Sequence, residues 1–257
     1  IEVLAICRPN SSKIKNIPKD KLVKIIECDI SDLQSLSTII DDKYDVFFHF
    51  AWKGTYGKAR NDVFMQNLNV KYTLDAVKLA SDLGCSAFVG AGSQAEYGRV
   101  EGKISGETKV NPENGYGIAK YSAGKLSGLY AKQLNIKHNW IRVLSVYGPC
   151  DNDYTMIMDT INKMLDNEET KFTKGEQIWD YLYCDDAAKA FYLVAVKGKD
   201  QTVYTLGSGI EKPLKEYINQ IRCIIGNNIE LGLGKIPYTE GQVMYLCADI
   251  KKLTEDT

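Results

Sequence analysis

Three residues could together carry out proton-transfer chemistry. Tyr116 and Lys120 are four positions apart, so on a helix they lie on one face, one turn apart. A tyrosine hydroxyl, with an ordinary pKa of about 10, is a poor base at neutral pH, but a nearby ammonium group favours the phenolate. Ser93, which follows an apolar run, could hydrogen-bond the same substrate oxygen and stabilise the charge that develops on it. The three residues predict an acid/base site.

The same spacing occurs a second time, at Tyr121 and Lys125. In a chain with 16 tyrosines, a motif this short is expected to match by chance, so context must decide. Tyr116 follows the helix-disfavouring pair Asn114-Gly115, which places it at a helix start, where a side chain can face a cleft. Tyr121 lies deeper in the same helix and is expected to pack or to face solvent. Tyr116 is therefore the favoured acid/base.

Short apolar runs alternate with amphipathic stretches over the first part of the chain. The apolar runs are typical of buried strands, and the stretches between them have helical spacing. Ser31 is a plausible N-cap of the first helix and Gly84 a plausible C-cap of the second. The alternation predicts an α/β fold with a doubly wound parallel sheet. The expected strands are Ile1–Cys7, Leu22–Cys28, Val46–Ala51, Ala87–Gly90 and Trp140–Leu144, and the expected helices are Ser31–Ile40, Asn61–Leu83 and Tyr116–Leu134.

After Pro149 the pattern loosens into polar loops, as expected of a smaller lobe. The expected helices there are Tyr154–Leu165, Asp186–Val196, Leu214–Ile225 and one beginning near Asp249. The expected strands are Lys171–Thr173 and Thr202–Leu206, with the run Trp179–Cys184 between them.

Composition narrows the class of protein. The formal net charge of −1 gives no basic excess, which argues against nucleic acid as a partner. No apolar run approaches the roughly 20 residues that span a bilayer, so no membrane association is expected. The seven cysteines are dispersed without C-x-x-C pairs, which favours reduced core thiols and a cytoplasmic location. With two histidines, no metal centre is expected.

Several motifs, in order along nearly the whole chain, resemble the extended short-chain dehydrogenase/reductase family. That family includes the NAD-dependent epimerase/dehydratase enzymes, which act on nucleotide sugars. The motifs are Gly92-Ser93-Gln94-Ala95-Glu96-Tyr97-Gly98, Glu107, Pro112, Tyr116-Gly117-Ile118-Ala119-Lys120, Asp45–Ala51, Asn69-Val70, Arg142 with Tyr147-Gly148-Pro149, and Trp179–Asp186.

The resemblance implies a Rossmann-like, doubly wound sheet with a smaller C-terminal lobe. Residues 1–149 would bind the cofactor, and residues 150–257 would mainly bind the substrate, with some segments returning to the first domain. Tyr116 would be the acid/base, Lys120 would lower its pKa and hold a cofactor ribose, and Ser93 would polarise the substrate. His49, inside an apolar strand end, and Asn69 are expected to be structural instead.

The resemblance also implies binding residues. Arg8, Asp29, Ile30, Phe50, Ala51 and Trp52, together with Tyr116 and Lys120, would contact the cofactor, while Ser93, Gln94, Ser145 and Trp179 would contact a nucleotide-diphosphate sugar.

The glycine-rich turn of a dinucleotide fold is not found before the first apolar run. The segment Gly90–Ala95 fits G-x-G-x-x-A, but it continues into the loop-like residues 96–102 instead of a helix, so we reject it. Either the protein never had this turn, or the chain begins about 25–30 residues late, after a first βα unit. We favour the second alternative.

The end of Ile1–Cys7 bears on the choice of cofactor. An acidic residue there would hold the adenosine ribose of NAD, but the chain has Cys7 followed by Arg8. A guanidinium group suits a 2′-phosphate, so NADP is modestly favoured over NAD.

Departures from the family pattern narrow the reaction. Gln94 and Ala95 stand where dehydratases carry Asp-Glu, which argues against dehydration. Ser145 and Trp179 stand where many members have Asn and Arg, so the usual phosphate contacts are altered. A nucleotide-sugar 4-epimerase and a 4-keto-sugar reductase remain equally favoured.

An alternative from another class is a non-catalytic, NADP-binding regulatory sensor. The intact set Ser93, Tyr116 and Lys120 argues against it, because a sensor does not need all three. A homodimer is possible through the apolar faces of Asn61–Leu83 and Tyr116–Leu134, which could instead cover the sheet.

Overall fold

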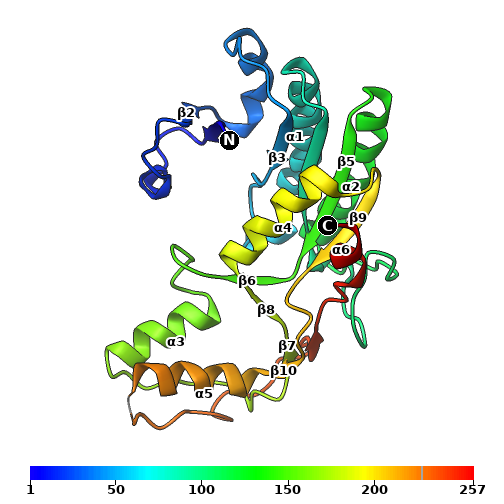
Figure 1. The fold of residues 1–257 in the computed structure, drawn as a ribbon. Coiled ribbons are helices and arrows are strands. Elements are labelled where there is room, and N and C mark those ends of the chain that lie inside the picture. The colour runs from blue at the N-terminus through cyan, green and yellow to red at the C-terminus, as the bar shows by residue number, and fades with distance from the viewer. Residues whose placement is uncertain (227) are drawn as a thin grey trace. The chain divides into compact units, whose positions relative to one another are not determined.

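The computed structural model describes residues 1–226 and 228–257, in two compact units (Figure 1). Unit 1 consists of Ile1–Gly98, Val110–Ile141 and Val194–Val203, and unit 2 of Arg99–Lys109, Arg142–Leu193 and Tyr204–Thr257. The chain thus crosses between the units several times. The expected division into 1–149 and 150–257 by function stays a prediction.

The main sheet of the protein has four strands in the order β3-β4-β5-β9. The strands are β3 (Val46–His49), β4 (Ala87–Ser93), β5 (Lys137–Val143) and β9 (Thr202–Leu206). β3 and β4 run parallel, and the expected α/β class with a parallel sheet is confirmed. Because parallel strands end at the same edge of a sheet, the residues after His49 come out beside Ser93.

Helices α1 (Val63–Asp82) and α2 (Gly115–Gln133) pack against each other and against β4. Leu83 is the C-cap of α1, and Gly84 follows it with a φ of 77°, a conformation that glycine adopts without steric cost. The Asn114 side chain caps α2 by accepting the Gly117 N–H at 2.9 Å. As expected, α2 therefore begins next to Tyr116.

The first two strands are less buried than their sequences predict. β1 (Val3–Cys7) and β2 (Val23–Glu27) run parallel, with Cys7 opposite Glu27. Val3 and Ile25 are each 45% exposed, so the expectation of fully buried strands is wrong here. Among the residues that the structure describes, β1 and β2 pair only with each other, which leaves apolar side chains uncovered.

The expected helix Ser31–Ile40 is a 3₁₀ helix, η2 (Ile30–Thr38), that begins one residue earlier. Its N-cap is Asp29 and not Ser31, because the Asp29 carboxylate accepts both the Ser31 N–H at 2.9 Å and the Ser31 hydroxyl at 2.6 Å. The charged acceptor is the stronger cap, which the pattern of apolar residues alone does not reveal.

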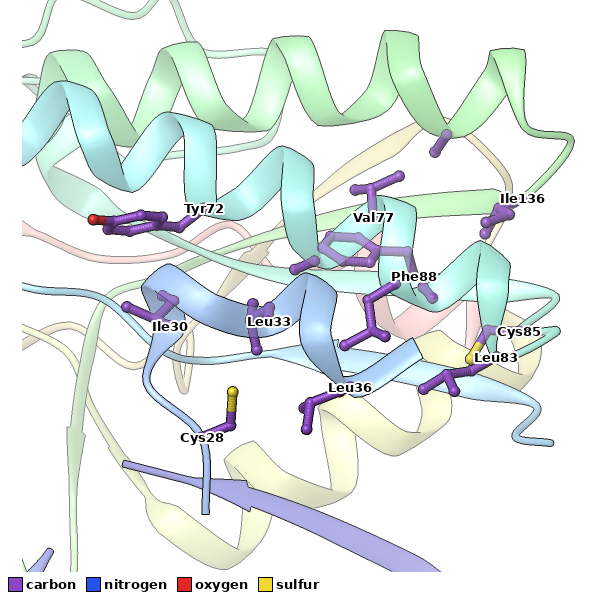
Figure 2. Packing of buried hydrophobic residues seen from close by; sticks show 14 residues of the cluster. Cys28, Ile30, Leu33, Leu36, Tyr72, Val77, Leu83, Cys85, Phe88 and Ile136 are labelled. Carbon is purple, nitrogen blue, oxygen red and sulfur yellow. The ribbon is translucent and has the colours of Figure 1, made fainter. Parts of the chain in front are cut away.

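A hydrophobic core cluster of unit 1 joins η2, α1 and β4 (Figure 2). Leu33 and Leu36 of η2 lie against Val77 of α1 and Phe88 of β4, and Ile136 closes the cluster beyond α2. Burying this much apolar surface fixes the packing of helices on the sheet and thereby the position of the strand ends.

Trp140 of β5 is 2% exposed and lies against three glycines. A Cβ atom at Gly90 would come within 2.3 Å of the indole ring, one at Gly92 within 2.4 Å, and one at Gly124 of α2 within 2.7 Å. Gly90 and Gly92 lie inside β4, so the G-x-G-x-x-A match serves packing, in agreement with its rejection as a dinucleotide fingerprint.

Unit 2 contains short strands and amphipathic helices. Its expected helices and β9 are found close to their predicted bounds, but Lys171–Thr173 forms no strand: Phe172 instead exchanges backbone hydrogen bonds with Gly232 and Ile236 in loops. The remaining elements are β6 (Ser145–Tyr147), paired with β8 (Tyr181–Tyr183); β7 (Ile178–Trp179), between β10 (Lys212–Pro213) and β11 (Tyr245–Leu246); and helices α3 (Met156–Leu165), α4 (Cys184–Lys197, which continues into unit 1), α5 (Leu214–Ile225) and α6 (Lys251–Asp256).

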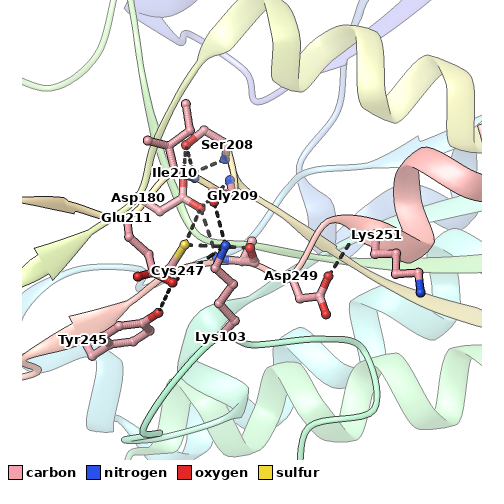
Figure 3. A network of polar contacts seen from close by, with 11 residues as sticks. Lys103, Asp180, Ser208, Gly209, Ile210, Glu211, Tyr245, Cys247, Asp249 and Lys251 are labelled. Carbon is pink, nitrogen blue, oxygen red and sulfur yellow. Dashed lines mark hydrogen bonds and ion pairs between the residues drawn. The ribbon is translucent and has the colours of Figure 1, made fainter.

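The fully buried carboxylate of Asp180 connects separate segments of unit 2 through hydrogen bonds (Figure 3). It accepts the Ser208 N–H at 2.6 Å, the Ser208 hydroxyl at 2.7 Å, the Gly209 N–H at 2.9 Å and the Ala248 N–H at 3.0 Å. A buried carboxylate is stable only when it is hydrogen-bonded in this way. Asp180 thus fixes the junction of β7 and β8 to the loop after β9 and to the residue after Cys247.

The cysteines only partly fulfil the expectation of core thiols. Cys28, Cys85 and Cys247 are buried, whereas Cys150 and Cys223 are exposed. In the described part of the chain, no helix combines the length and apolar character needed to cross a membrane.

Replacing Gly90 by Ala is expected to destabilise the protein by roughly 1–3 kcal/mol, because the new methyl group overlaps the Trp140 ring. Urea unfolding of the variant measures this loss. The same substitution in a Trp140→Leu background should cost less, because the overlapping ring is gone. Equal costs in both backgrounds would contradict the packing described for Trp140.

The two histidines make stability depend on pH. Burial lowers the pKa of His49 to about 3, helped by the Lys120 charge, and lowers the pKa of His138 to about 4. Both stay neutral in the folded protein, while the unfolded chain takes up protons below about pH 6.5. The free energy of unfolding should therefore fall between pH 7 and pH 5, by about 2 kcal/mol per histidine. A His138→Gln variant should show a smaller fall in urea titrations at the two pH values, and an unchanged fall would contradict the assignment.

Candidate functional site

The structure brings Ser93, Tyr116 and Lys120 together within unit 1. Ser93 ends β4, and Tyr116 and Lys120 occupy the first two turns of α2. All three are buried, with 9%, 9% and 4% of their surfaces exposed. A side-chain hydrogen bond from Ser93 works to lower the pKa of the Tyr116 phenol. The set is therefore preorganised on one strand end and one helix.

The Lys120 ammonium group is held among aromatic rings. Its Nζ donates to the Ala91 carbonyl at 2.6 Å and lies 4.0 Å from the centre of the Trp52 ring and 6.0 Å from that of Tyr116. Burial lowers the pKa of Lys120 to about 7, with Glu96 acting in the opposite direction. Near neutral pH, Lys120 is therefore present in both its charged and its neutral form.

A cationic residue that the sequence did not single out acts on the pKa of Tyr116. Burial raises the pKa of Tyr116, and the Ser93 hydrogen bond and the Arg60 charge oppose that rise. The Arg60 guanidinium carbon lies 4.4 Å from the centre of the Tyr116 ring. Arg60 comes from the short helix η3 (Gly57–Asn61), and nothing in its own sequence context marks it as a site residue.

The loop after β3 is braced from α1. The Asn69 side chain, fully buried, donates to the Lys53 carbonyl at 2.8 Å and accepts the Lys53 N–H at 2.9 Å. Gln66 accepts the Trp52 indole N–H at 2.9 Å, which holds Trp52 edge-on to Tyr116 at 6.1 Å. Asn69 is thus a structural hydrogen-bonding residue, as expected. Phe50 and Ala51, in the same loop, are exposed.

Of the other residues expected at a cofactor, Asp29 contacts the loop after β3. The Asp29 carboxylate pairs with the Lys53 ammonium group at 2.8 Å, and hydrogen bonds from Lys53 and Ser31 hold its pKa well below the usual range. Ile30 is 8% exposed and packs in the core. Arg8 is exposed just after β1.

Unit 2 holds Ser145 and Trp179, which contact each other. The Trp179 indole N–H donates to the Ser145 hydroxyl at 2.9 Å, and the Tyr217 hydroxyl donates to the Trp179 carbonyl at 3.2 Å. Next to Ser145 lies a pocket of about 240 Å³. One carboxylate, Asp151, lines it, and no lysine or arginine does. The lining residues are Leu144, Ser145, Val146, Tyr147, Asp151, Thr155, Met156, Ile157 and Tyr181.

Glu96 is a second residue that its sequence context did not single out, because residues 96–102 are loop-like in sequence. It lies in the 3₁₀ helix η4 (Gln94–Glu96) and is fully buried. Ser93 and Glu96 form a capping box, in which each side chain accepts a backbone N–H of the other end of the turn. The sequence signal was present, since Ser-x-x-Glu is the signature of this cap. Gln94, on the same turn, is partly exposed.

Comparison with known proteins places these observations in a family. The family model for the NAD dependent epimerase/dehydratase family matches residues 1–207. A putative UDP-glucose 4-epimerase of Methanocaldococcus jannaschii is 28% identical over 237 residues, which cover 89% of this chain and 76% of that protein.

Solved structures share the fold. The UDP-glucose 4-epimerase of Thermotoga maritima, in a complex with UDP-glucose, superposes with a TM-score of 0.85 at 22% identity over 99% of this chain and 84% of that one. The UDP-glucuronic acid 4-epimerase of Bacillus cereus, in a complex with NAD, gives a TM-score of 0.81 at 22% identity over 99% and 83%. At such identities these structures establish the Rossmann-type fold alone. Together with the match over residues 1–207, they lead to one conclusion: the chain belongs to the NAD dependent epimerase/dehydratase family.

Proposed function

We propose that this protein is an NAD(P)-dependent enzyme that transfers a hydride at C4 of a nucleotide sugar, with 4-epimerisation as its reaction. The observation that carries the proposal is the buried set Ser93, Tyr116 and Lys120 at the end of β4. The similarity to a putative UDP-glucose 4-epimerase supports the substrate class.

Each residue of the set has a distinct task. Tyr116 removes the proton from the sugar hydroxyl as the carbon is oxidised and returns it on reduction. Ser93 donates a hydrogen bond to the same oxygen and stabilises its developing charge. Lys120 and Arg60 supply positive charge near the phenol, and this charge favours the phenolate.

The residues of unit 1 fit part of a nicotinamide dinucleotide. When bound, its ring accepts and returns the hydride. Lys120, a buried ammonium group with a single carbonyl partner at 2.6 Å, has donors left for ribose hydroxyls, and the exposed Phe50-Ala51 loop offers apolar surface beside them. In the described ranges, no glycine-rich turn leads from a strand into a helix N-terminus, so the fit does not extend to the pyrophosphate.

Two charged residues, Arg8 and Glu27, favour different cofactors. The exposed Arg8 guanidinium favours a 2′-phosphate. The Glu27 carboxylate, opposite Cys7 in the strand register, accepts the Asn10 N–H at 2.9 Å and favours ribose hydroxyls instead. The second candidate function, a 4-keto-sugar reductase that consumes NADPH, rests on the preference for NADP that Arg8 favours.

Dehydration is not part of the proposal. Gln94 and Ala95 follow Ser93, so the turn offers no carboxylate at these positions, and Glu96 is buried in hydrogen bonds to Ser93 and Trp140. Elimination of water from a sugar needs a group that takes or gives a proton at the neighbouring carbons.

Identifying the nucleotide that the denatured protein releases separates the two candidates. For the epimerase we expect the released nucleotide to be NAD, together with interconversion of two UDP-sugars without net consumption of cofactor. Stoichiometric oxidation of added NADPH by a 4-keto sugar would establish the reductase and overturn the epimerase.

A Tyr116→Phe variant should lose at least about 100-fold in kcat, because the proton transfer has no replacement group. Tyr121→Phe, on the same helix with the same chemical change, serves as the matched control and should keep wild-type turnover. Both are assayed with UDP-sugars. Full turnover by the Tyr116 variant would remove this residue from the mechanism.

We also propose a homodimer through α1 and α2. Phe64 and Leu68 on α1, and Ile118, Leu126 and Leu129 on α2, repeat at helical spacing and are 44–82% exposed. Leu129→Lys should shift the molar mass in light scattering from dimer to monomer, while Leu165→Lys on α3 should not. A monomeric wild-type protein would contradict the proposal.

A further inference from the structure

Glu96 is a buried carboxylate that the proposed reaction does not use directly. It is fully buried, and its Oε1 accepts two N–H groups: the Ser93 backbone N–H at 2.9 Å and the Trp140 indole N–H at 2.9 Å. A buried carboxylate is costly unless hydrogen bonds and a cation compensate for it. Because burying Glu96 beside the site is costly, its carboxylate is expected to have a function there: it holds groups of the site in place.

The hydrogen bonds of Glu96 determine where the Ser93 hydroxyl lies. The bond to the Ser93 N–H closes the capping box of η4, while the Ser93 hydroxyl accepts the Ala95 N–H at 3.2 Å. The turn after β4 is thus fixed from both ends, and Ser93 cannot rotate away without breaking the box.

Trp140 in turn fixes Glu96. The indole ring is held against Gly90, Gly92 and Gly124, so its N–H is directed at one point. A Cβ atom at Gly92 would also come within 2.6 Å of Glu96 Oε1. Strands β4 and β5 and helix α2 therefore all contribute to the position of one carboxylate oxygen.

The charge of Glu96 acts on both groups of the proposed proton transfer. The Lys120 ammonium group is 4% exposed and lies 5.9 Å from the centre of the Trp140 ring, whose indole N–H donates to Glu96. The Glu96 charge acts on the pKa of Lys120 and the Lys120 charge on that of His49, while the groups that act on the pKa of Tyr116 are Ser93, Arg60 and Glu96. His49 is neutral, so Glu96 is the acidic group acting on Lys120 among the described residues. Its negative charge raises the pKa of Lys120 and that of Tyr116.

We propose that Glu96 is a positioning residue for the proposed hydride-transfer reaction: its carboxylate fixes Ser93 and supplies the negative charge that balances the buried Lys120 ammonium group. This inference rests on the proposed function for its catalytic meaning, but its electrostatic part is independent of any substrate. Replacing Glu96 by Gln keeps the shape and an acceptor oxygen and removes the charge.

Two of the three tryptophans report on Lys120 without substrate. The ammonium group lies 4.0 Å from the centre of the Trp52 ring and 5.9 Å from that of Trp140. Tryptophan fluorescence should therefore titrate with Lys120, with a midpoint at pH about 7 in the wild type. A Lys120→Met variant should lack this transition, which assigns it.

In Glu96→Gln the fluorescence midpoint should move down by about one pH unit, because the buried cation has lost its opposite charge. Glu101→Gln, the same chemical change at an exposed position, should leave the midpoint in place. An unchanged midpoint in Glu96→Gln would overturn the electrostatic part of the proposal, whether or not the wild type turns over a nucleotide sugar.

The pH profile of kcat tests the catalytic part. Loss of Glu96 lowers the pKa of both Tyr116 and Lys120, so both limbs of the profile should move to lower pH in Glu96→Gln. Trp140→Phe keeps the charge and removes one donor, so it should lower kcat without moving the profile. If Glu96→Gln does not fold, Trp140→Phe still tests whether the charge of Glu96 matters. A shifted pH profile in Trp140→Phe would show that packing alone moves the profile, and it would overturn the proposed role of the charge. Absence of turnover in the wild type would instead count against the proposed function.

Discussion

The burial of one ammonium group constrains much of unit 1. Lys120 is almost fully buried, and a lone charge there would cost several kcal/mol. The structure offsets this cost with the Ala91 carbonyl, the Trp52 ring and the Glu96 carboxylate. Each of these needs its own support: Gln66 for Trp52, and the glycine-lined position of Trp140 for Glu96. The rigid packing around the site follows from this requirement.

The sequence predicted the parts of the site that depend on local structure. Tyr116 and Lys120 are brought together by a single helix, so their spacing sufficed. Ser93 lies at the end of β4, which continues three residues beyond the predicted strand Ala87–Gly90. The order of the motifs along the chain indicated the family resemblance, which the match over residues 1–207 confirms.

The parts that the sequence did not predict depend on contacts between distant positions. Arg60 reaches Tyr116 from 56 positions away, and Trp140 reaches Glu96 from 44 positions away, so neither has a local pattern. The exposure of β1 and β2 was missed for a related reason, since apolar strands indicate burial only when neighbouring strands cover them. Asp29 replaced Ser31 as the cap because a capping hydrogen bond depends on where the turn begins.

The Asp180 carboxylate has a consequence for the order in which the chain assembles. Its donors lie 28, 29 and 68 positions away along the sequence, at Ser208, Gly209 and Ala248. Contacts of such long sequence separation form late, because loop closure must precede them. During synthesis, which proceeds from the N-terminus, the core of unit 1 through Ile141 can form from residues already made, whereas the Asp180 junction must wait until Ala248 has emerged. Until then the Asp180 carboxylate lacks one of its donors, so unit 2 completes its folding after unit 1.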